Sequence, residues 1–238
     1  MAGLLLGTSG WSYTEWKGSF YPEKIRPDEM LSFYAGRFSA VEINNSFYRM
    51  PSESVLIKWR ETAPATFRFA FKAPQEITHR RRLVDAEGPT KRFAEVLATM
   101  QDRLGPVLFQ LPPYQRADLR RLERFLEMAR PLYARIAFEF RHASWLEQPA
   151  LDLLTRFDAA LCSTESDTER QPVHPASNFV YFRLRKTEYT DGELTAWKAE
   201  LAKLVDRGLD VFCFFKHEGS GKGPEFVRRM LADDHEHP

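Results

Sequence analysis

Charged and polar side chains recur at the ends of short apolar runs in this 238-residue sequence. A charged group at the end of an apolar strand loses hydration, at a substantial cost in free energy, unless a partner or a ligand replaces the water. The repetition over distant segments therefore predicts one shared polar pocket. Its members are Glu42, Asn44, Lys72, Gln110, Glu139, Arg141, Arg183, Arg185, Lys216 and His217.

Glu42 and Glu139 are the predicted acid and base of this pocket. Burial raises the pKa of a carboxyl group and a nearby cation lowers it, so two carboxylates in different surroundings can divide the two roles. Lys72 and His217 complete the predicted catalytic set. A structural interpretation stays open, because Glu42 can pair with Lys72 and Glu139 with Arg141. The catalytic interpretation expects Glu42→Gln and Glu139→Gln to weaken binding or turnover while the protein stays folded.

The predicted ligand-binding side chains combine strand-end polar groups with aromatic and histidine residues of the adjoining loops. Large rings also seal the rim of a fold wherever loops cover a core, so the aromatic members have a structural alternative. The predicted set is Trp11, Tyr13, Asn44, Tyr48, His79, Gln110, Arg141, His142, Trp145, Arg183, Arg185 and Lys216.

The sequence predicts neither a dinucleotide nor a firm metal site. The turn after the first apolar run leads into aromatic residues and lacks the glycine spacing of a dinucleotide-binding loop. His79 and His142 could join Glu42 and Glu139 as nitrogen and oxygen ligands of a divalent metal, and this stays as an alternative. No HExxH pair or cysteine cluster fixes such a site.

A glycine-rich segment over residues 217–226 precedes the last predicted helix. Glycines let backbone amides approach a ligand, and barrels often bind phosphate after their last two strands. Together with Arg183, Arg185 and Lys216, this segment predicts a small anionic or sugar-like ligand. A flexible glycine turn without a ligand is the alternative.

A basic cluster at residues 80–82 follows His79 and suggests a second kind of partner, a nucleic acid. The net charge of the chain is only +1, which opposes that interpretation, and a solvated basic loop is the simpler alternative.

Eight short apolar runs separated by helical patterns predict a parallel sheet that closes into a single (β/α)8 barrel over residues 1–238, with a frayed tail from about residue 233. An open, doubly wound sheet is the second choice. The predicted strands are Leu4–Thr8, Ala40–Asn44, Arg68–Lys72, Val107–Leu111, Ile136–Phe140, Ala160–Ser163, Val180–Arg185 and Val211–Phe215. In such a barrel the strand ends and the loops after them form the functional face.

Apolar residues at helical spacing predict the helices between these strands. Asp118 caps one of them, and Thr190 with Glu193 forms a capping box on another. Only the crossover between strands six and seven, residues 164–178, lacks a helical pattern. The predicted helices span 28–38, 52–62, 90–104, 118–131, 147–157, 190–207 and 224–231, with Gly105 and Pro106 ending the third.

Composition limits the remaining possibilities. Two cysteines, Cys162 and Cys213, lie in apolar runs and are expected to be buried free thiols. No stretch is apolar over a membrane-spanning length and no signal sequence is recognised, so a cytoplasmic protein without membrane contact is expected.

Five long motifs resemble the YecE-like family, domain of unknown function seventy-two. They are GTSGWSYTEWKGSFYP from Gly7, VEINNSFYRMP from Val41, FKAPQEITH from Phe71, LGPVLFQLPP from Leu104 and FEFRHASW from Phe138. The resemblance implies a TIM-type barrel and assigns no substrate. Members often carry an Asn-Asn-Asp-like segment after the last strand, where this chain has Lys216, His217 and Glu218.

The convergent charged set favours an enzyme acting on a small anionic or sugar-like metabolite, of hydrolase, isomerase or lyase type. A nucleic-acid binder or metal-dependent nuclease and a non-catalytic ligand-binding scaffold stay as alternatives. The oligomeric state is not predicted.

Overall fold

Eight parallel strands close into a barrel in the computed structural model, which describes residues 3–216 and 221–232. Each strand pairs with the next along the chain, and β8 returns to β1, where Gly7 lies opposite Phe214. The predicted TIM barrel is therefore confirmed. The strands are β1 (Leu4–Ser9), β2 (Ala40–Ile43), β3 (Arg68–Lys72), β4 (Leu104–Gln110), β5 (Ile136–Glu139), β6 (Ala160–Glu165), β7 (Phe179–Leu184) and β8 (Asp210–Phe215).

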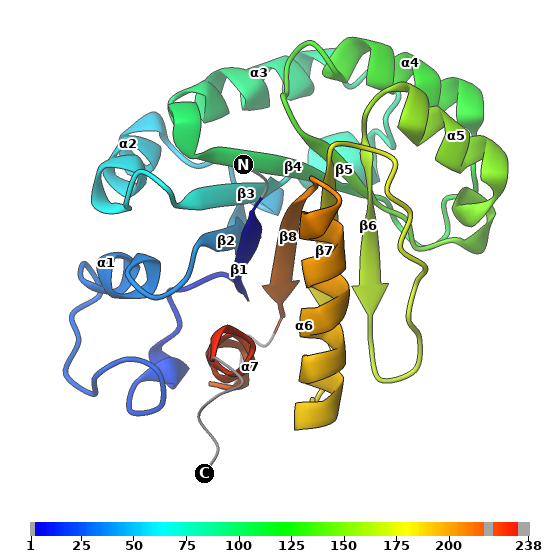
Figure 1. The fold of residues 1–238 in the computed structure, drawn as a ribbon. Coiled ribbons are helices and arrows are strands. Elements are labelled where there is room, and N and C mark those ends of the chain that lie inside the picture. Colours follow the sequence, from blue (N-terminus) through cyan, green and yellow to red (C-terminus); the bar gives the residue numbers. More distant parts are fainter. Residues whose placement is uncertain (1–2, 217–220, 233–238) are drawn as a thin grey trace.

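The α-helices lie outside the barrel and cover its strands, with α3, α4 and α5 along one side and α6 beside α7 (Figure 1). They are α1 (Met30–Ala35), α2 (Glu53–Thr62), α3 (Glu87–Ala98), α4 (Leu119–Ala129), α5 (Gln148–Arg156), α6 (Asp191–Asp206) and α7 (Lys222–Leu231). The predicted caps are present, because Asp118 accepts from the amide of Arg121 and Thr190 forms the capping box with Glu193. None of the described helices is long and apolar enough to cross a membrane.

The prediction for the third helix was wrong at its C-terminal end. The helix ends at Ala98, and Gly105 and Pro106, expected to stop it, lie inside β4. Gln101 has a φ of 51°, a left-handed conformation that ends the helical pattern early. Gly105 fits the strand because a Cβ there would lie 3.0 Å from the carbonyl oxygen of Phe69. The missing side chain allows β3 and β4 to approach closely.

The crossover between β6 and β7 contains no helix in the described structure, as predicted. Its backbone is held instead by bonds to neighbouring segments. The Gln171 amide donates to Thr164, and the Asn178 amide donates to the carboxylate of Asp158.

The barrel interior is filled by small residues on one side and aromatic residues on the other. Alanines from β2, β3, β5 and β6 face the rings of Phe179, Tyr181, Phe212 and Phe214 within one buried cluster that also contains Cys162. A larger apolar cluster fills the layer between strands and helices and includes Cys213. Both cysteines are free and buried, as predicted. The lower and middle levels of the barrel are thus packed core, and only its upper level is polar.

Gly7 is required where β1 meets β2. A Cβ at this position would lie 1.8 Å from the carbonyl oxygen of Ala40, a backbone atom that no rotamer change can move. We expect Gly7→Ala to lower the free energy of unfolding by more than about 3 kcal/mol, above the usual cost of overpacking. Chemical denaturation measures this.

Gly192→Ala in α6 is the matched control, since nothing lies within 4 Å of the added Cβ. Its stability should be unchanged or higher by at most about 1 kcal/mol, because alanine favours the helix. Equal denaturation midpoints for the two variants would show that the contact between β1 and β2 tolerates a side chain.

Candidate functional site

A polar layer lies at the C-terminal ends of the barrel strands. Side chains along a strand alternate between its two faces, and Ala40, Ala70, Ala137 and Tyr181 belong to the interior core. The residues two positions later therefore also point inward, at the next level up. We define the polar layer as these residues and the neighbours that hydrogen-bond or ion-pair with them: Ser9, Glu42, Asn44, Lys72, Gln110, Glu139, Arg141, Tyr181, Arg183 and Arg185.

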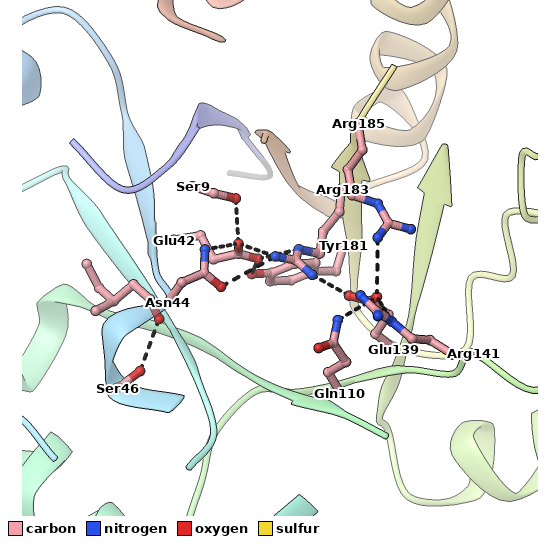
Figure 2. Close-up of polar contacts among 11 residues, drawn as sticks. Ser9, Glu42, Asn44, Ser46, Gln110, Glu139, Arg141, Tyr181, Arg183 and Arg185 are labelled. Carbon is pink, nitrogen blue, oxygen red and sulfur yellow. Dashed lines mark hydrogen bonds and ion pairs between the residues drawn. The ribbon is translucent and has the colours of Figure 1, made fainter. Parts of the chain in front are cut away.

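Arg183 lies at the centre of this layer, between Glu42 and Glu139 (Figure 2). Its Nη1 donates to Oε2 of Glu139 at 2.5 Å, and its Nη2 donates to Oε2 of Glu42 at 3.0 Å. Its Nε also lies 3.0 Å from Oε1 of Glu42. The arginine is 1% exposed and both carboxylates are fully buried. One guanidinium therefore joins β2 and β5 from β7, across the barrel.

Glu42 accepts hydrogen bonds on both carboxylate oxygens. Ser9 and Asn44 donate to Oε2 at 2.6 and 3.0 Å, and the Tyr181 hydroxyl donates to Oε1 at 2.8 Å. Burial alone would raise the pKa of Glu42, but the charge of Arg183 and these three donors outweigh it and lower the pKa. Glu42 is therefore ionised at neutral pH.

Glu139 is held by cations on both oxygens. Besides Arg183, its Oε1 accepts from Gln110 Nε2 at 2.7 Å and from Arg141 Nε at 3.1 Å. Nη1 of Arg185 lies 3.9 Å from the same oxygen. Burial opposes ionisation here too, but the three arginines hold the pKa of Glu139 far below its usual range.

The expected division of Glu42 and Glu139 into acid and base is not found. Both pKa values are lowered, and the lone pairs of both carboxylates face donors, so neither group is suited to exchange a proton near neutral pH. Their geometry instead stabilises Arg183 as a buried cation, whose pKa is raised well above its ordinary value.

Lys72, at the end of β3, differs from every other member of the layer. Among the described residues, no carboxylate lies within ion-pair distance of its amine, and its nearest defined contact is the Phe47 ring, 4.0 Å from Nζ. Burial and the charge of Arg183 lower the pKa of Lys72 to about 8, against the opposing effect of Glu139 and Glu42. This amine is therefore about half neutral near pH 8 and still mostly protonated at pH 7. The predicted pairing of Glu42 with Lys72 is wrong, because Arg183 occupies Glu42.

His79 lies near Lys72, in a short helical turn after β3. Its ring contacts Phe47 edge-on, with centroids 4.9 Å apart, and Nδ1 lies 2.9 Å from the Thr78 hydroxyl. Burial, followed by the charges of Lys72 and Arg141, lowers the pKa of His79. The imidazole is therefore mainly neutral at physiological pH.

A cavity of about 470 Å³ opens beside the polar layer, between the loop after β1, the loop after β2, and helices α1 and α2. It does not lie over the ion pairs, and Asn44 is the residue that borders both. The rings of Trp11 and Trp59 meet edge to face in its wall, with centroids 4.8 Å apart. Of the predicted binding residues, Trp11, Tyr13 and Asn44 line this cavity.

Other predicted site residues lie away from the polar layer or have structural partners. Trp145 is fully buried, stacks on Phe140 and donates to the carbonyl of Gln115, so it supports the loop after β4. Tyr48 is 75% exposed. His142 accepts from the amide of Ser144 in the loop after β5.

The end of β8 is described only in part. Lys216 follows the strand and donates its amide to the carbonyl of Leu184. Residues 217–220 lie outside the described residues, so the predicted catalytic role of His217 has no structural test, and only residues 221–226 of the glycine segment are described. At the edge of that segment, Lys222 is paired with Glu188.

The alternative metal site is not supported by donor geometry. Within the described ranges, the structure brings together no group of three or more His, Cys, Asp or Glu side chains that could hold a metal ion. Glu42 and Glu139 both bind Arg183, while His79 and His142 bond within their own loops.

The basic cluster proposed for nucleic acid is used in part by its own loop. Arg81 lies 3.3 Å from Glu76 and donates to the carbonyl of Asp85. Arg82 has a φ of 51°. These contacts fit the solvated basic loop that the sequence left as an alternative.

Sequence reasoning missed three functional neighbours. Ser9 and Tyr181 bind Glu42, and strand alternation could have indicated them, since Tyr181 precedes Arg183 by two residues. Trp59 of α2 reaches the cavity from a helix whose apolar pattern only indicated packing.

Comparison with known proteins identifies relatives over the whole barrel. A family model described as "Protein of unknown function DUF72" matches residues 5–237. UPF0759 protein YunF of Bacillus subtilis is 24% identical over 96% of this chain and 93% of its own.

Solved structures show the same architecture. A DUF72 family protein of Thermotoga maritima superposes with a TM-score of 0.82 at 24% identity, covering 96% of this chain and 98% of that one. D-psicose 3-epimerase of Clostridium cellulolyticum superposes with a TM-score of 0.54 at 12% identity, covering 97% and 93%. The second similarity is distant and shows the barrel fold alone.

The buried network gives a prediction on stability. Glu42→Gln replaces a carboxylate oxygen, which accepts hydrogen bonds in the wild type, by an NH2 group that cannot accept them. It also removes one of the two negative charges that pair with Arg183. We expect the free energy of unfolding to fall by about 3–5 kcal/mol, the usual cost of breaking a buried pair. Urea denaturation measures it, and this revises the milder effect expected from the sequence.

Glu87→Gln is the control, because Glu87 forms an exposed ion pair with Lys91 at 2.6 Å. It should show no measurable change in the free energy of unfolding.

Wild-type stability should also fall as pH drops below about 4.3, the glutamate pKa of an unfolded chain, since the folded-state pKa values of Glu42 and Glu139 are lower. A flat profile from pH 5 to pH 3 contradicts the network.

Proposed function

The chain belongs to the DUF72 family, and from this premise and the geometry of its polar layer we propose that it is an enzyme acting on a small anionic metabolite at the mouth of the barrel. The ligand carries a carboxylate or phosphate group. The observation that carries this proposal is the excess of cations around two carboxylates that are already fully engaged.

Counted over the part of the chain that the structure describes, the charges of the layer do not balance. Lys72, Arg141, Arg183 and Arg185 are cationic when Lys72 is protonated, against two anions, Glu42 and Glu139. Arg183 is buried and its two Nη groups donate to the carboxylates of Glu139 and Glu42, so it is not the cation that meets a ligand. The surplus lies on Lys72, Arg141 and Arg185, which retain partial exposure.

The two outer arginines keep donors for a ligand. Arg141 bonds Glu139 through Nε, and its Nη groups donate to no described residue. Nε of Arg185 is buried without a hydrogen-bond partner among the described residues. Unsatisfied buried donors are costly, and an anion that accepts from them would remove that cost.

Lys72 supplies the group that can change its charge during a reaction. With its pKa lowered to about 8, it can accept or release a proton near neutral pH, unlike the two glutamates. This favours chemistry that begins with proton transfer or attack by the amine. Among the predicted catalytic residues, we therefore propose Lys72, rather than Glu42 or Glu139, as the group that exchanges a proton.

The adjoining cavity can take the uncharged part of such a ligand. Indole rings and the side chains of Asn44, Asn45 and Asp28 line it, a combination of apolar faces and hydrogen-bonding groups that suits a hydroxylated, sugar-like body. Asn44 connects the cavity to Arg183 and Glu42. Asn44 is therefore the point at which a ligand in the cavity would approach the polar layer.

We expect Arg141→Gln and Arg185→Gln each to weaken the binding of inorganic phosphate or acetate at least about tenfold, because each removes a charge-assisted donor worth roughly 1.5–3 kcal/mol. Isothermal titration calorimetry measures the dissociation constants of the wild-type chain and both variants.

Arg207→Gln is the control of equal charge change, since Arg207 is exposed at the C-terminal end of α6, before β8 begins. Its affinity should match the wild type. Equal losses in all three variants would indicate unspecific attraction by net charge, and absence of binding to the wild-type chain at low salt would overturn the proposal.

A further inference from the structure

Among the residues that the structure describes, the amine of Lys72 has no counter-ion, although charged groups surround it. Arg183 takes both carboxylates of the layer, and the described structure gives Nζ neither a hydrogen bond nor an ion pair. Apart from the cation–π contact with Phe47, the described residues offer an ammonium ion at this position none of the partners that normally stabilise it. Its pKa is lowered to about 8, so part of the amine is neutral near pH 8, and the lone pair of that neutral form is a nucleophile.

Charged and titratable groups face Lys72 from several elements. They are Glu42 from β2, Glu139 and Arg141 from β5 and the loop after it, Arg183 from β7, and His79 from the turn after β3. The two arginines disfavour the ammonium form and the two glutamates favour it, but the glutamates are already neutralised by their own arginine contacts. Desolvation is the largest influence, and it acts in the same direction as the arginines.

The Phe47 ring covers one side of the Lys72 amine. Nζ lies 4.0 Å from its centroid, and the loop after β2 that carries Phe47 is fixed by Ser46, whose hydroxyl donates to the carbonyls of Ile43 and Lys72. Phe47 is itself buried. The ring thus restricts the amine to the mouth of the barrel, on the same face as Arg141 and Arg185.

We propose that Lys72 is a covalent catalytic residue that forms an imine with the carbonyl group of an anionic aldehyde, ketone or keto acid. The proposal deepens the proposed function, because the anionic group of the substrate is bound by Arg141 and Arg185 and the carbonyl carbon is presented to Nζ. A carbonyl next to a carboxylate or a phosphate ester satisfies both requirements in one small molecule.

The step balances without an external oxidant or reductant. The lone pair of the neutral amine attacks the carbonyl carbon, a C–N bond forms as the C=O π bond breaks, and a proton moves from nitrogen to oxygen to give a carbinolamine. The hydroxyl group then takes up one proton and leaves as water, and a protonated imine remains. Overall, the amine, the carbonyl compound and one proton give the protonated imine and water. His79, whose ring contacts the same Phe47 ring as the amine, is our proposed carrier of these protons.

Borohydride trapping tests this step. The full chain is incubated with pyruvate, and in parallel with the uncharged ketone dihydroxyacetone, in the presence of sodium cyanoborohydride. Hydride addition turns an imine into a stable secondary amine, and intact mass followed by peptide mapping locates it. We expect one adduct per chain on Lys72, formed at least tenfold faster than on the exposed Lys203.

Two variants make the result specific. Lys72→Arg keeps the positive charge, and this variant should yield no adduct at position 72. Lys203→Arg is the matched control and should trap pyruvate at Lys72 as fast as the wild type. A folded wild-type chain in which Lys72 reacts no faster than Lys203 with either ketone overturns the proposal.

The pH dependence provides an independent readout. Acetylation of Lys72 by limiting acetic anhydride should rise through a midpoint near pH 8, following its lowered pKa. A midpoint for Lys72 near 10.4, the pKa of a lysine in a model peptide, contradicts the lowered pKa.

The failure of imine formation can be separated from the failure of anion binding. If phosphate binds through Arg141 and Arg185 but neither ketone is trapped, this inference is wrong and the proposed function stands. If dihydroxyacetone is trapped on Lys72 and phosphate does not bind, the amine is the nucleophile and the anion site is wrong.

Discussion

A guanidinium that is almost completely removed from water needs its charge and its donors satisfied by the protein, and this requirement organises the mouth of the barrel. Arg183 meets it with one carboxylate from β2 and another from β5. Each carboxylate in turn needs its remaining lone pairs filled, by Ser9, Asn44 and Tyr181 on one side and by Gln110 and Arg141 on the other. The ion pairs of the polar layer therefore form one continuous network, and a change at Glu42, Glu139 or Arg183 leaves a buried group unpaired.

The same network determines which groups remain free to react. Because both glutamates are committed to arginines, the amine of Lys72 is left in a partly desolvated position without an anion beside it. Structural ion pairs and a reactive amine are thus produced by one arrangement of charges. The excess of cations follows from the same arrangement, since three arginines approach a single carboxylate, that of Glu139.

The loops after β1 and β2 add shape to this electrostatic site. They leave a cavity between α1 and α2 whose wall is the contact between Trp11 and Trp59, and Asn44 joins it to the ion pairs. Charge lies at the centre of the mouth and apolar surface at its edge. This division suits a ligand with one ionised end, and it agrees with the general position of active sites in barrels of this fold.

Much of the fold could be predicted from the sequence, because strand and helix periods are local properties of the chain. All eight strands were located within a few residues, and the capping box at Thr190 and the crossover without a helix were identified from residue types alone. The end of α3 was predicted wrongly. Gly105 and Pro106 are typical of a helix stop, but they fit equally well in a strand that packs closely against its neighbour.

Residue types alone also indicated which side chains gather at the strand ends, because alternation along a strand sets the direction of every second residue. Tertiary structure alone decided the pairing. Glu42 could have met Lys72 on the next strand, but Arg183, 141 residues away along the chain, reaches it across the barrel. Which cation a buried carboxylate binds depends on side-chain length and on distances across the closed sheet, and no local pattern contains that information. The state of Lys72 follows from that choice, since an amine is left without a partner only after the carboxylates have been assigned elsewhere.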